Sequence, residues 1–265
     1  MAATAKPATP NTQTTWPADV KTLSIDVGGT GLKGSVLDAN GAMTCDRVRI
    51  ETPYPCPPEK LVSSLVDLTQ GMPEYHRVTV GFPGLVRSGR VIQVPSLSRA
   101  EYGGPRDPEL ASKWEGFDLA TALAEAFKVP VKVANDADVQ GAAVAQGDGF
   151  EFVMTLGTGV GTSVFSDGRL LPHMELSHAP FRDGETFDIL LGNEHRKKIG
   201  KKHWRKLVTE AIQAFDDFLF FDHIYIGGGN AKHYPVTLLG AKATIVPNTS
   251  GILGGIKIWD MDLES

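Results

Sequence analysis

The chain carries the tripeptide Gly-Thr-Gly twice, at residues 29–31 and again at residues 157–159, about half its length apart. In both places one apolar run leads into the glycines and a second apolar run follows them. Five of the nine residues counted from Gly29 and from Gly157 are identical. Apolar runs on both sides of a short glycine turn predict a β-hairpin. The repeat therefore predicts two duplicated lobes, each beginning with a strand, a glycine turn and a strand.

Further runs rich in Val and Ile alternate with segments of helical periodicity along the rest of the chain. This alternation predicts an α/β protein with mixed sheets. Residues 96–114 contain two Gly and two Pro in a short space, and we expect an irregular surface excursion there. The expected strands cover residues 22–27, 33–38, 77–82, 129–134, 151–156, 162–166, 223–227 and 242–246.

Helices are expected where apolar residues recur every three or four positions. Leu61, Leu65 and Leu68 have this spacing, which places them on one face of a helix. Asp118 has a side chain that commonly caps the first turn of a helix. The expected helices cover residues 58–68, 118–127, about 202–218, and a short stretch after Ser250.

Composition excludes several classes of protein. A formal net charge of −5 argues against general binding to nucleic acids or anionic membranes, and no run approaches the roughly 18 apolar residues that a membrane helix needs. Residues 1–20 lack an apolar core and predict a disordered tail rather than a signal peptide. Cys45 and Cys56 are the only cysteines, which leaves no disulfide framework. These features predict a cytoplasmic protein.

The first glycine turn also fits two motifs of other proteins. Gly29, Gly31 and Gly34 have the spacing of dinucleotide-binding proteins, and Val36 completes the pattern of the protein-kinase glycine loop. The dinucleotide motif must open a helix, however, whereas the residues after Gly31 predict a strand. The further motifs of protein kinases and the Walker motif are absent from the sequence. An NAD-dependent dehydrogenase stays a remote alternative.

The turn over residues 28–31 exposes backbone N–H groups, and side-chain-free residues let phosphate oxygens approach them closely. Asp26, at the end of the preceding strand, is placed to hold Mg²⁺ directly or through water, or else to cap the turn. A third glycine cluster, residues 227–229, follows a strand and precedes a short helix at Asn230. It can present N–H groups to a distal phosphate or nucleotide, or form a simple tight turn.

Five motifs occur together in one order: Ile25-Asp26-Val27-Gly28-Gly29-Thr30, Gly81-Phe82-Pro83-Gly84, Asn135-Asp136-Ala137-Asp138, Leu156-Gly157-Thr158-Gly159-Val160-Gly161 and Ile226-Gly227-Gly228-Gly229. In this order they resemble the ROK family of sugar kinases, over about residues 22–258. The run from Gly29 to Gly34, with Lys33 after the phosphate turn, is similar to the polyphosphate glucokinases of that family, the polyphosphate/ATP glucomannokinases included.

The resemblance implies the actin/hexokinase-like (ribonuclease H-like) ATPase fold, with two duplicated lobes of mixed sheets and a cleft between them. It divides the chain into an N-terminal lobe over 21–136, with the phosphate turn and a sugar wall, and a C-terminal lobe over 137–249. Residues 250–265 are expected to form a C-terminal helix that packs back on the N-terminal lobe.

The resemblance also implies the transfer of a phosphoryl group from inorganic polyphosphate, and from ATP, to the 6-hydroxyl of glucose and mannose, with Mg²⁺ required. Asp136, just beyond a strand where open α/β sheets place ligands, is the expected general base. Asp138 is its rival, although we expect it to cap the following helix. Asn135, Glu175 and His178 are expected to bind the sugar. The residues expected around the metal and phosphates are Asp26, Gly28, Gly29, Thr30, Lys33, Thr158, Gly159, Gly228 and Gly229.

Two departures from the family pattern bear on the sugar site. No cysteine follows Cys56, so the family's cysteine-rich zinc motif is missing and no zinc is expected. The family's Glu-x-Gly-His motif occurs with Ser177 in place of the glycine. Glu175 and His178, with His173 nearby, can alternatively be metal ligands.

Residues 195–206 hold seven of the chain's 26 Lys and Arg and no acidic residue. Like charges this close repel each other unless an anion screens them. We expect Lys197, Lys198, Lys201 and Lys202 to form a track for polyphosphate, with a solvated start of a helix as the alternative.

Two further alternatives belong to other classes of protein. A sugar-responsive repressor would need a DNA-reading domain of about 60 residues ahead of the first turn, whereas only 24 residues precede Ile25. A non-sugar ATPase of the same fold would consume the donor without sugar. The sequence gives no oligomeric state.

Overall fold

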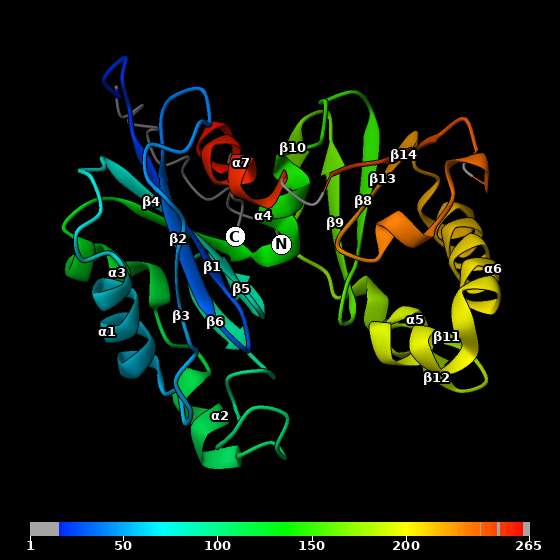
Figure 1. The fold of residues 1–265 in the computed structure, drawn as a ribbon, viewed down its shortest axis with the longest axis horizontal. Coiled ribbons are helices and arrows are strands. Elements are labelled where there is room, and N and C mark those ends of the chain that lie inside the picture. Colours follow the sequence, from blue (N-terminus) through cyan, green and yellow to red (C-terminus); the bar gives the residue numbers. More distant parts are fainter. Residues whose placement is uncertain (1–15, 239, 248–249, 262–265) are drawn as a thin grey trace, which may run out of the picture.

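The computed structural model describes residues 16–238, 240–247 and 250–261. Two five-stranded sheets stand side by side, with helices on the outer face of each and two further helices, α4 and α7, between them (Figure 1). Each sheet is the centre of one lobe.

The sheet of the N-terminal lobe has the strand order β3-β2-β1-β4-β7. β1 (Thr22–Val27) and β2 (Leu32–Leu37) form the first glycine hairpin, and β3 (Val48–Ile50) pairs antiparallel with β2. On the other side of β1, β4 (Arg77–Phe82) and then β7 (Val131–Asn135) are added in parallel.

The sheet of the C-terminal lobe has the order β10-β9-β8-β13-β14. β8 (Phe150–Leu156) and β9 (Val160–Ser166) form the second glycine hairpin, and β10 (Arg169–Leu170) pairs antiparallel with β9. β13 (His223–Gly227) and then β14 (Ala243–Ile245) are parallel to β8. The two sheets therefore share one topology, which confirms the predicted duplication.

All eight expected strands are present, within a few residues of their expected bounds. The strands that the sequence did not predict have two to four residues, too few to show a period. Besides β3 and β10, they are the hairpin of β5 (Leu85–Arg87) and β6 (Arg90–Gln93) and that of β11 (Pro180–Arg182) and β12 (Glu185–Thr186).

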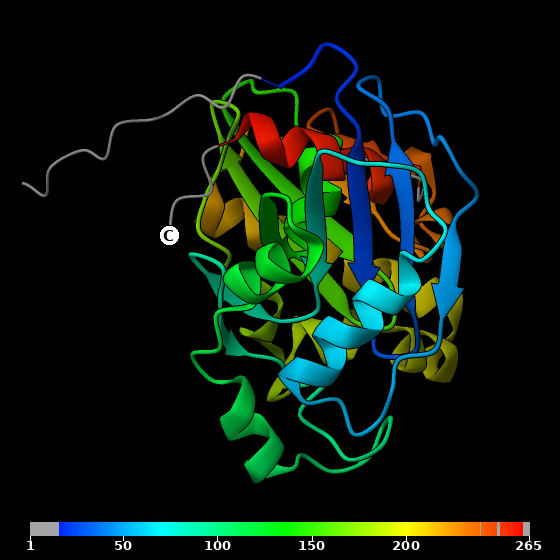
Figure 2. The same cartoon turned by 90° about the vertical axis from the view of Figure 1, so that its left-hand side faces the viewer.

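Two helices of the N-terminal lobe occur as expected, and one was missed. α1 (Pro58–Leu68) and α3 (Leu119–Phe127) lie across the face of the sheet that looks away from the other lobe (Figure 2). Asp118 caps α3 by accepting a hydrogen bond from the N–H of Thr121. The expectation for residues 96–114 was wrong at its end, because α2 (Pro108–Trp114) forms there and buries Trp114.

The helices of the C-terminal lobe are α5 (Phe187–Leu191) and the long α6 (Asn193–Leu219), which covers the outer face of the second sheet (Figure 1). α6 begins earlier than expected and is kinked at Gly200, whose φ of 78° a residue with a Cβ rarely adopts. After the kink, the indole of Trp204 is buried and donates to the carbonyl of Leu191.

Helix α4 (Asp136–Ala142) lies at the joint between the two lobes, against β4, β7, β8 and β9. α7 (Ser250–Lys257) packs on α4 so closely that a Cβ on Gly254 would overlap the carbonyl of Val139. α7 also contacts β1 and β4. The lobe boundary predicted between residues 136 and 137 falls at the start of α4 and stays a prediction. The described part of the chain also contains four short 3₁₀ helices: η1 (Leu176–His178), η2 (Ala231–His233), η3 (Val236–Leu238) and η4 (Ile258–Asp260).

Most of the tail predicted over residues 1–20 lies outside the described residues. Trp16 packs edge-on against Trp259, with ring centroids 5.3 Å apart, and both indoles contact the guanidinium of Arg77. Residues 16–20 therefore belong to the folded N-terminal lobe.

Each lobe has its own hydrophobic core, and a third cluster joins them. Trp114 and Phe82 lie in the first core, and Trp204, Phe152 and Phe215 in the second. The third cluster combines side chains of α4, β8, β9 and β13 with Ile258 from the C-terminal end. It fixes the position of α4, whose first residues form the site described next.

Candidate active site

The centre of the site is the point where β7 ends and α4 begins. Asn135 is buried and is the N-cap of α4: its Oδ1 accepts a hydrogen bond from the N–H of Ala137 (2.7 Å). Its Nδ2 donates to the carbonyl of Gly84 at 3.1 Å. Both the oxygen and the nitrogen of the Asn135 side chain thus form hydrogen bonds. One of the two Nδ2 hydrogens remains for another partner.

Asp136, the first residue of α4, is half-buried, and its Oδ1 also accepts from the N–H of Ala137, at 2.9 Å. Burial raises the pKa of Asp136 to about 7, and the negative charge of Asp26 adds to this. The hydrogen bond from Ala137 and the charge of His173 act in the opposite direction. A carboxylate with a pKa near neutrality can accept a proton and release it again.

Asp138 does not cap the helix, so that expectation was wrong. Asn135 is the cap, and the carboxylate of Asp138 points into the protein, where its Oδ1 lies 2.9 Å from Nδ1 of His173. Both side chains are at least 96% buried. Asp138 is also too deeply buried to reach a substrate as readily as Asp136.

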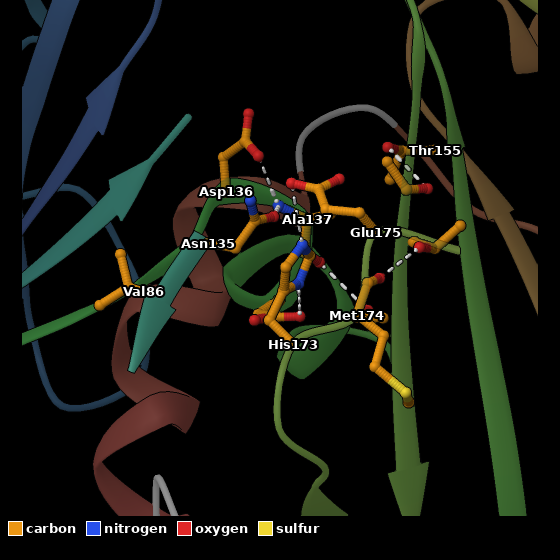
Figure 3. Close-up of polar contacts among 12 residues, drawn as sticks. Val86, Asn135, Asp136, Ala137, Thr155, His173, Met174 and Glu175 are labelled. Carbon is orange, nitrogen blue, oxygen red and sulfur yellow. Dashed lines mark hydrogen bonds and ion pairs between the residues drawn. The ribbon is translucent and has the colours of Figure 1, made fainter. Parts of the chain in front are cut away.

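His173, Glu175 and His178 follow β9 and β10 in the chain, and Figure 3 shows His173 and Glu175 close to the start of α4. Nε2 of His173 lies 3.6 Å from Oε1 of Glu175, and Nε2 of the half-exposed His178 lies 4.0 Å from Oε2 of the same carboxylate. Figure 3 shows the carboxylates of Asp136 and Glu175 on the same side of the His173 ring. The structure thus brings together Asn135, Asp136 and Glu175, with His178 at the edge.

The first glycine turn, residues 28–31, is held by its carbonyl groups. Thr52 donates to the carbonyl of Gly28, Tyr54 to that of Gly29 and Arg49 to that of Thr30. Among the described residues, none accepts a hydrogen bond from the N–H of Gly29, Thr30 or Gly31. The turn therefore keeps its donors available for an anion.

Asp26 and Lys33 face each other across the hairpin, with Nζ of Lys33 3.0 Å from Oδ2 of Asp26. Arg47 approaches the same oxygen at 3.7 Å. The side chain of Asp26 is 46% exposed, and no hydrogen bond or ion pair in the described part of the chain uses its Oδ1. The dinucleotide-binding motif requires its glycines to open a helix. Here the glycine turn is followed by strand β2, so that requirement is not met.

The second and third glycine motifs lie next to each other. Nδ2 of Asn230, directly after the third motif, donates to the carbonyl of Gly157 at 2.8 Å, and its N–H donates to Leu156. Gly228 approaches Leu156 so closely, with a φ of 83°, that a Cβ would overlap its backbone. Asp188 from α5 supports the second turn by accepting from the N–H of Val160 at 2.7 Å.

An open pocket of about 480 Å³ lies beside the second glycine turn. Thr158 contributes from the turn, Asp188 from α5, and Lys198 from the first segment of α6. The remaining lining residues are Ile189, Gly192, Glu194 and His195. Part of the basic run therefore lines the same pocket as the second glycine turn.

The four lysines of the predicted track are all exposed but differ in surroundings. Lys198 lines the pocket, and Lys201 lies near enough to η2 to help lower the pKa of His233, after the larger effect of burial. Lys197 is paired with Glu194 at 2.9 Å. For Lys202 the structure shows exposure alone.

Several supporting residues were missed by the sequence analysis. Arg196, Lys232 and Arg205 lie near His233, which they also affect electrostatically, and Arg205 donates to the His233 carbonyl. The signal for Arg196 and Arg205 was the basic run itself, whereas Lys232, Asp188 and Asn230 had no signal beyond their polar character.

Among the described residues, no group of three or more His, Cys, Asp and Glu side chains is arranged to hold a metal ion. The alternative in which His173, Glu175 and His178 are metal ligands therefore lacks support. Nor does any helix in the described ranges combine the length and apolar composition needed to cross a bilayer.

The comparisons with known proteins show the family of the chain. The model of the ROK family matches residues 22–175. A polyphosphate glucokinase of Mycobacterium tuberculosis is 27% identical over 247 residues, which cover 88% of each chain. The crystal structure of an inorganic polyphosphate/ATP-glucomannokinase from Arthrobacter sp. strain KM is similar with a TM-score of 0.74 at 27% identity, covering 91% of this chain and 99% of that one.

A ROK family glucokinase from Streptomyces griseus, in complex with glucose and AMPPNP, has a TM-score of 0.66 at 15% identity, over 90% of this chain and 98% of that chain. At this identity the likeness concerns the fold alone. The family match covers more than half of the chain, and the two sheets have the duplicated arrangement described above. The chain belongs to the ROK family and has the actin/hexokinase-like fold of its sugar kinases.

Proposed function

We propose that this ROK sugar kinase transfers a phosphoryl group from inorganic polyphosphate, and also from ATP, to the 6-hydroxyl of glucose and of mannose. The observation that carries the proposal is the carboxylate of Asp136, half-buried at the end of β7, with its pKa raised to about 7 by burial and by the charge of Asp26. The names of the two relatives at 27% identity support the choice of donor and sugar.

In the proposed reaction, Asp136 accepts the proton of the 6-hydroxyl while that oxygen bonds to the transferred phosphorus. A base with a pKa near the working pH suits this task, and such bases typically contribute about 10²–10⁴-fold. Glu175 accepts hydrogen bonds from other sugar hydroxyls, and its pKa is lowered by the neighbouring His173. His178 and the remaining Nδ2 hydrogen of Asn135 complete the sugar contacts.

The donor lies between the glycine turns in this proposal. The free N–H groups of Gly29, Thr30 and Gly31 hold the phosphate nearest the sugar, with Gly28, whose own N–H donates to the carbonyl of Gly31, beside them. Thr158 and Gly159, with Gly228 and Gly229 beside them, hold the phosphates farther away. Lys33 adds a positive charge near the first group, where it is paired with Asp26.

Mg²⁺ fits the residues present. Magnesium prefers one or two carboxylates, with phosphate and water completing its shell. Oδ1 of Asp26 is such a carboxylate oxygen, half-exposed and unused by the described residues. When bound, the ion would neutralise charge on the phosphates, and Asp26 would hold it directly or through water.

Polyphosphate as a donor is supported by the basic run, because Lys198 lines the pocket beside Thr158 and Lys201 lies near η2. The polymer carries about one charge per phosphorus, so a row of cations that continues beyond the donor pocket favours it over a compact nucleotide. A ROK glucokinase that uses ATP alone, or a kinase of another hexose, is the alternative.

Replacement of Asp136 by Asn tests the proposal. The amide keeps the shape of the carboxylate but cannot take the proton, so turnover with glucose should fall by at least 10²-fold with either donor. Glucose affinity, measured by calorimetry, should stay within a few-fold of that of the unchanged protein. A variant that retained more than a few per cent of the activity would show that Asp136 is not the base.

A further inference from the structure

The buried imidazole of His173 has a role in this site that the proposed reaction does not yet use. Its Nδ1 lies 2.9 Å from Oδ1 of Asp138, and its Nε2 lies 3.6 Å from Oε1 of Glu175. The ring is 97% buried, and Nε2 has no hydrogen-bond partner within 3.5 Å among the described residues. Carboxylates therefore face the ring on both of its nitrogen atoms.

A neutral imidazole carries a hydrogen on one nitrogen only, whereas an imidazolium donates from both. Two ionised carboxylates, one at each nitrogen, accept hydrogen bonds and donate none. The arrangement is therefore complementary to the charged ring. Burial by itself lowers the pKa of His173, but the interactions with Asp138 and Glu175 raise it to about 9.

Other charged groups face this ring from the elements around it. Asp136 lies at the start of α4, and the positive charge of His173 lowers the pKa of its carboxyl group. From β5, in the other lobe, Arg87 donates a hydrogen bond to the backbone carbonyl of His173, and its charge acts on Asp138. His178 on η1 lies 4.0 Å from Glu175, and Asp26 of β1 acts on Asp136.

Without a cation here, three carboxylates (those of Asp136, Asp138 and Glu175) would share one partly dehydrated region. Like charges this close favour protonation of at least one of them. A protonated Asp136 could not act as a base. A protonated Glu175 would be a weaker hydrogen-bond acceptor for the sugar than its ionised form. A buried positive charge next to these groups opposes the protonation of Asp136 and of Glu175.

We propose that His173 is a buried cation that positions Glu175 for the sugar and favours the ionised form of Asp136. His173 contacts neither substrate in this arrangement, so it is a positioning residue rather than a catalytic one. The inference rests on the proposed function for the roles of Glu175 and Asp136, whereas the charge of the ring can be measured independently of that function.

The first experiment uses the unmodified protein. Imidazole ¹⁵N resonances, assigned through the backbone resonances of His173, report how many ring nitrogens carry hydrogen. We expect both ring nitrogens of His173 to be protonated at pH 7.5. A neutral ring at pH 7.5 would overturn the proposal even if the protein were an active sugar kinase.

The second experiment replaces His173 with Gln, which is polar and of similar length but uncharged. We expect the KM for glucose to rise by about 10-fold, in line with the loss of one charged hydrogen-bonding partner. The acid limb of the pH profile of kcat/KM should move up by about one unit, because removal of the positive charge raises the pKa of Asp136. His76→Gln, away from the site, is the matched control and should leave both quantities unchanged.

An unshifted acid limb and an unchanged KM in a folded His173→Gln variant would also overturn the inference. If that variant does not fold, the state of the ring in the unmodified protein still decides. Failure of the proposed function can be distinguished from failure of this inference. If the proposed function is wrong, the Asp136→Asn variant stays active, whereas the charge on the His173 ring is the same in either case.

Discussion

The two glycine turns are products of one repeated pattern, yet the structure surrounds them differently. Both join the antiparallel strands at the centre of sheets with the same strand order. The first turn spans residues 28–31 between Val27 and Leu32, whereas the second spans residues 157–159 between Leu156 and Val160 and is one residue shorter. The repeated sequence thus specifies the hairpin, but not the length of its turn.

The chemical difference is larger. Next to the first turn, Asp26 and Lys33 form a charged pair across the hairpin. The strands that enter and leave the second turn place uncharged residues there, Thr155 opposite Gly161. Its nearby carboxylate, Asp188, comes from α5 and accepts a backbone hydrogen bond. In the proposed reaction, the first lobe would therefore bring charge to the point of transfer, while the second would hold the donor through its backbone.

The largest expected effect is a difference in activity between variants of Asp26, beside the first turn, and of Asp188, beside the second. Asp26→Asn should lower kcat with either donor by at least 100-fold, because the charge that would attract Mg²⁺ is lost. Asp188→Asn keeps an oxygen that can accept from the N–H of Val160, so its activity should stay within about 3-fold. Initial rates across a Mg²⁺ series measure both, and equal losses in the two variants would contradict the asymmetry.

The second prediction concerns the stability of the N-terminal lobe and its pH dependence. The pKa of Asp136 is raised in the folded protein, so the folded state binds this proton more tightly than the unfolded chain does. Ionisation of Asp136 therefore reduces stability as the pH rises from about 4 to about 8. Asp136→Asn removes that reduction.

We expect the two proteins to be equally stable near pH 4. At pH 8, Asp136→Asn should be the more stable by about 2 kcal/mol, after allowance for the partial exposure of the carboxylate. Urea unfolding at both pH values measures the difference. A difference that is the same at both pH values would show that it does not come from ionisation.

The sequence predicted those parts of the fold whose signal is local. Strands β1, β4 and β13 have the bounds that were expected, because each is a short apolar run between turn residues. Helix α4 begins before Asp138, the residue expected to cap it. This earlier start was not predicted, because Asn and Asp, which form its N-cap and most of its first turn, also favour turns. Helix α2 was hidden in a segment rich in glycine and proline.

For the candidate site, too, the sequence predicted the residues with a local signal and not the contacts between distant segments. Asp136 stood out because a carboxylate directly follows a buried strand. The pairing of Asp138 with His173 was not predictable, since the two residues come from α4 and from the segment after β10, and no sequence pattern records that contact. The supports of the first turn by Thr52, Tyr54 and Arg49 are tertiary contacts of the same kind.

The smallest expected effect tests the proposed track for polyphosphate on the C-terminal lobe. Lys198 lines the pocket beside Thr158 and Lys201 lies near η2, whereas Lys197 is paired with Glu194. Lys198→Gln/Lys201→Gln should raise the KM for polyphosphate by about 10-fold and weaken its dependence on salt, because fewer charges contact the polymer. The KM for ATP, a shorter anion, should change less.

Lys197→Gln/Lys202→Gln removes the same charge from the same segment and is the matched control. We expect it to change the KM for polyphosphate by less than about 3-fold, since the charge of Lys197 is already offset and salt screens isolated exposed charges. Assays of both donors across a salt series separate the two double variants. If they weakened polyphosphate use equally, net charge rather than position along α6 would determine the affinity. If both also lost ATP use to the same extent, the basic run would not be a track for the polymer, and the second lobe's hold on the donor would end at its glycine turns.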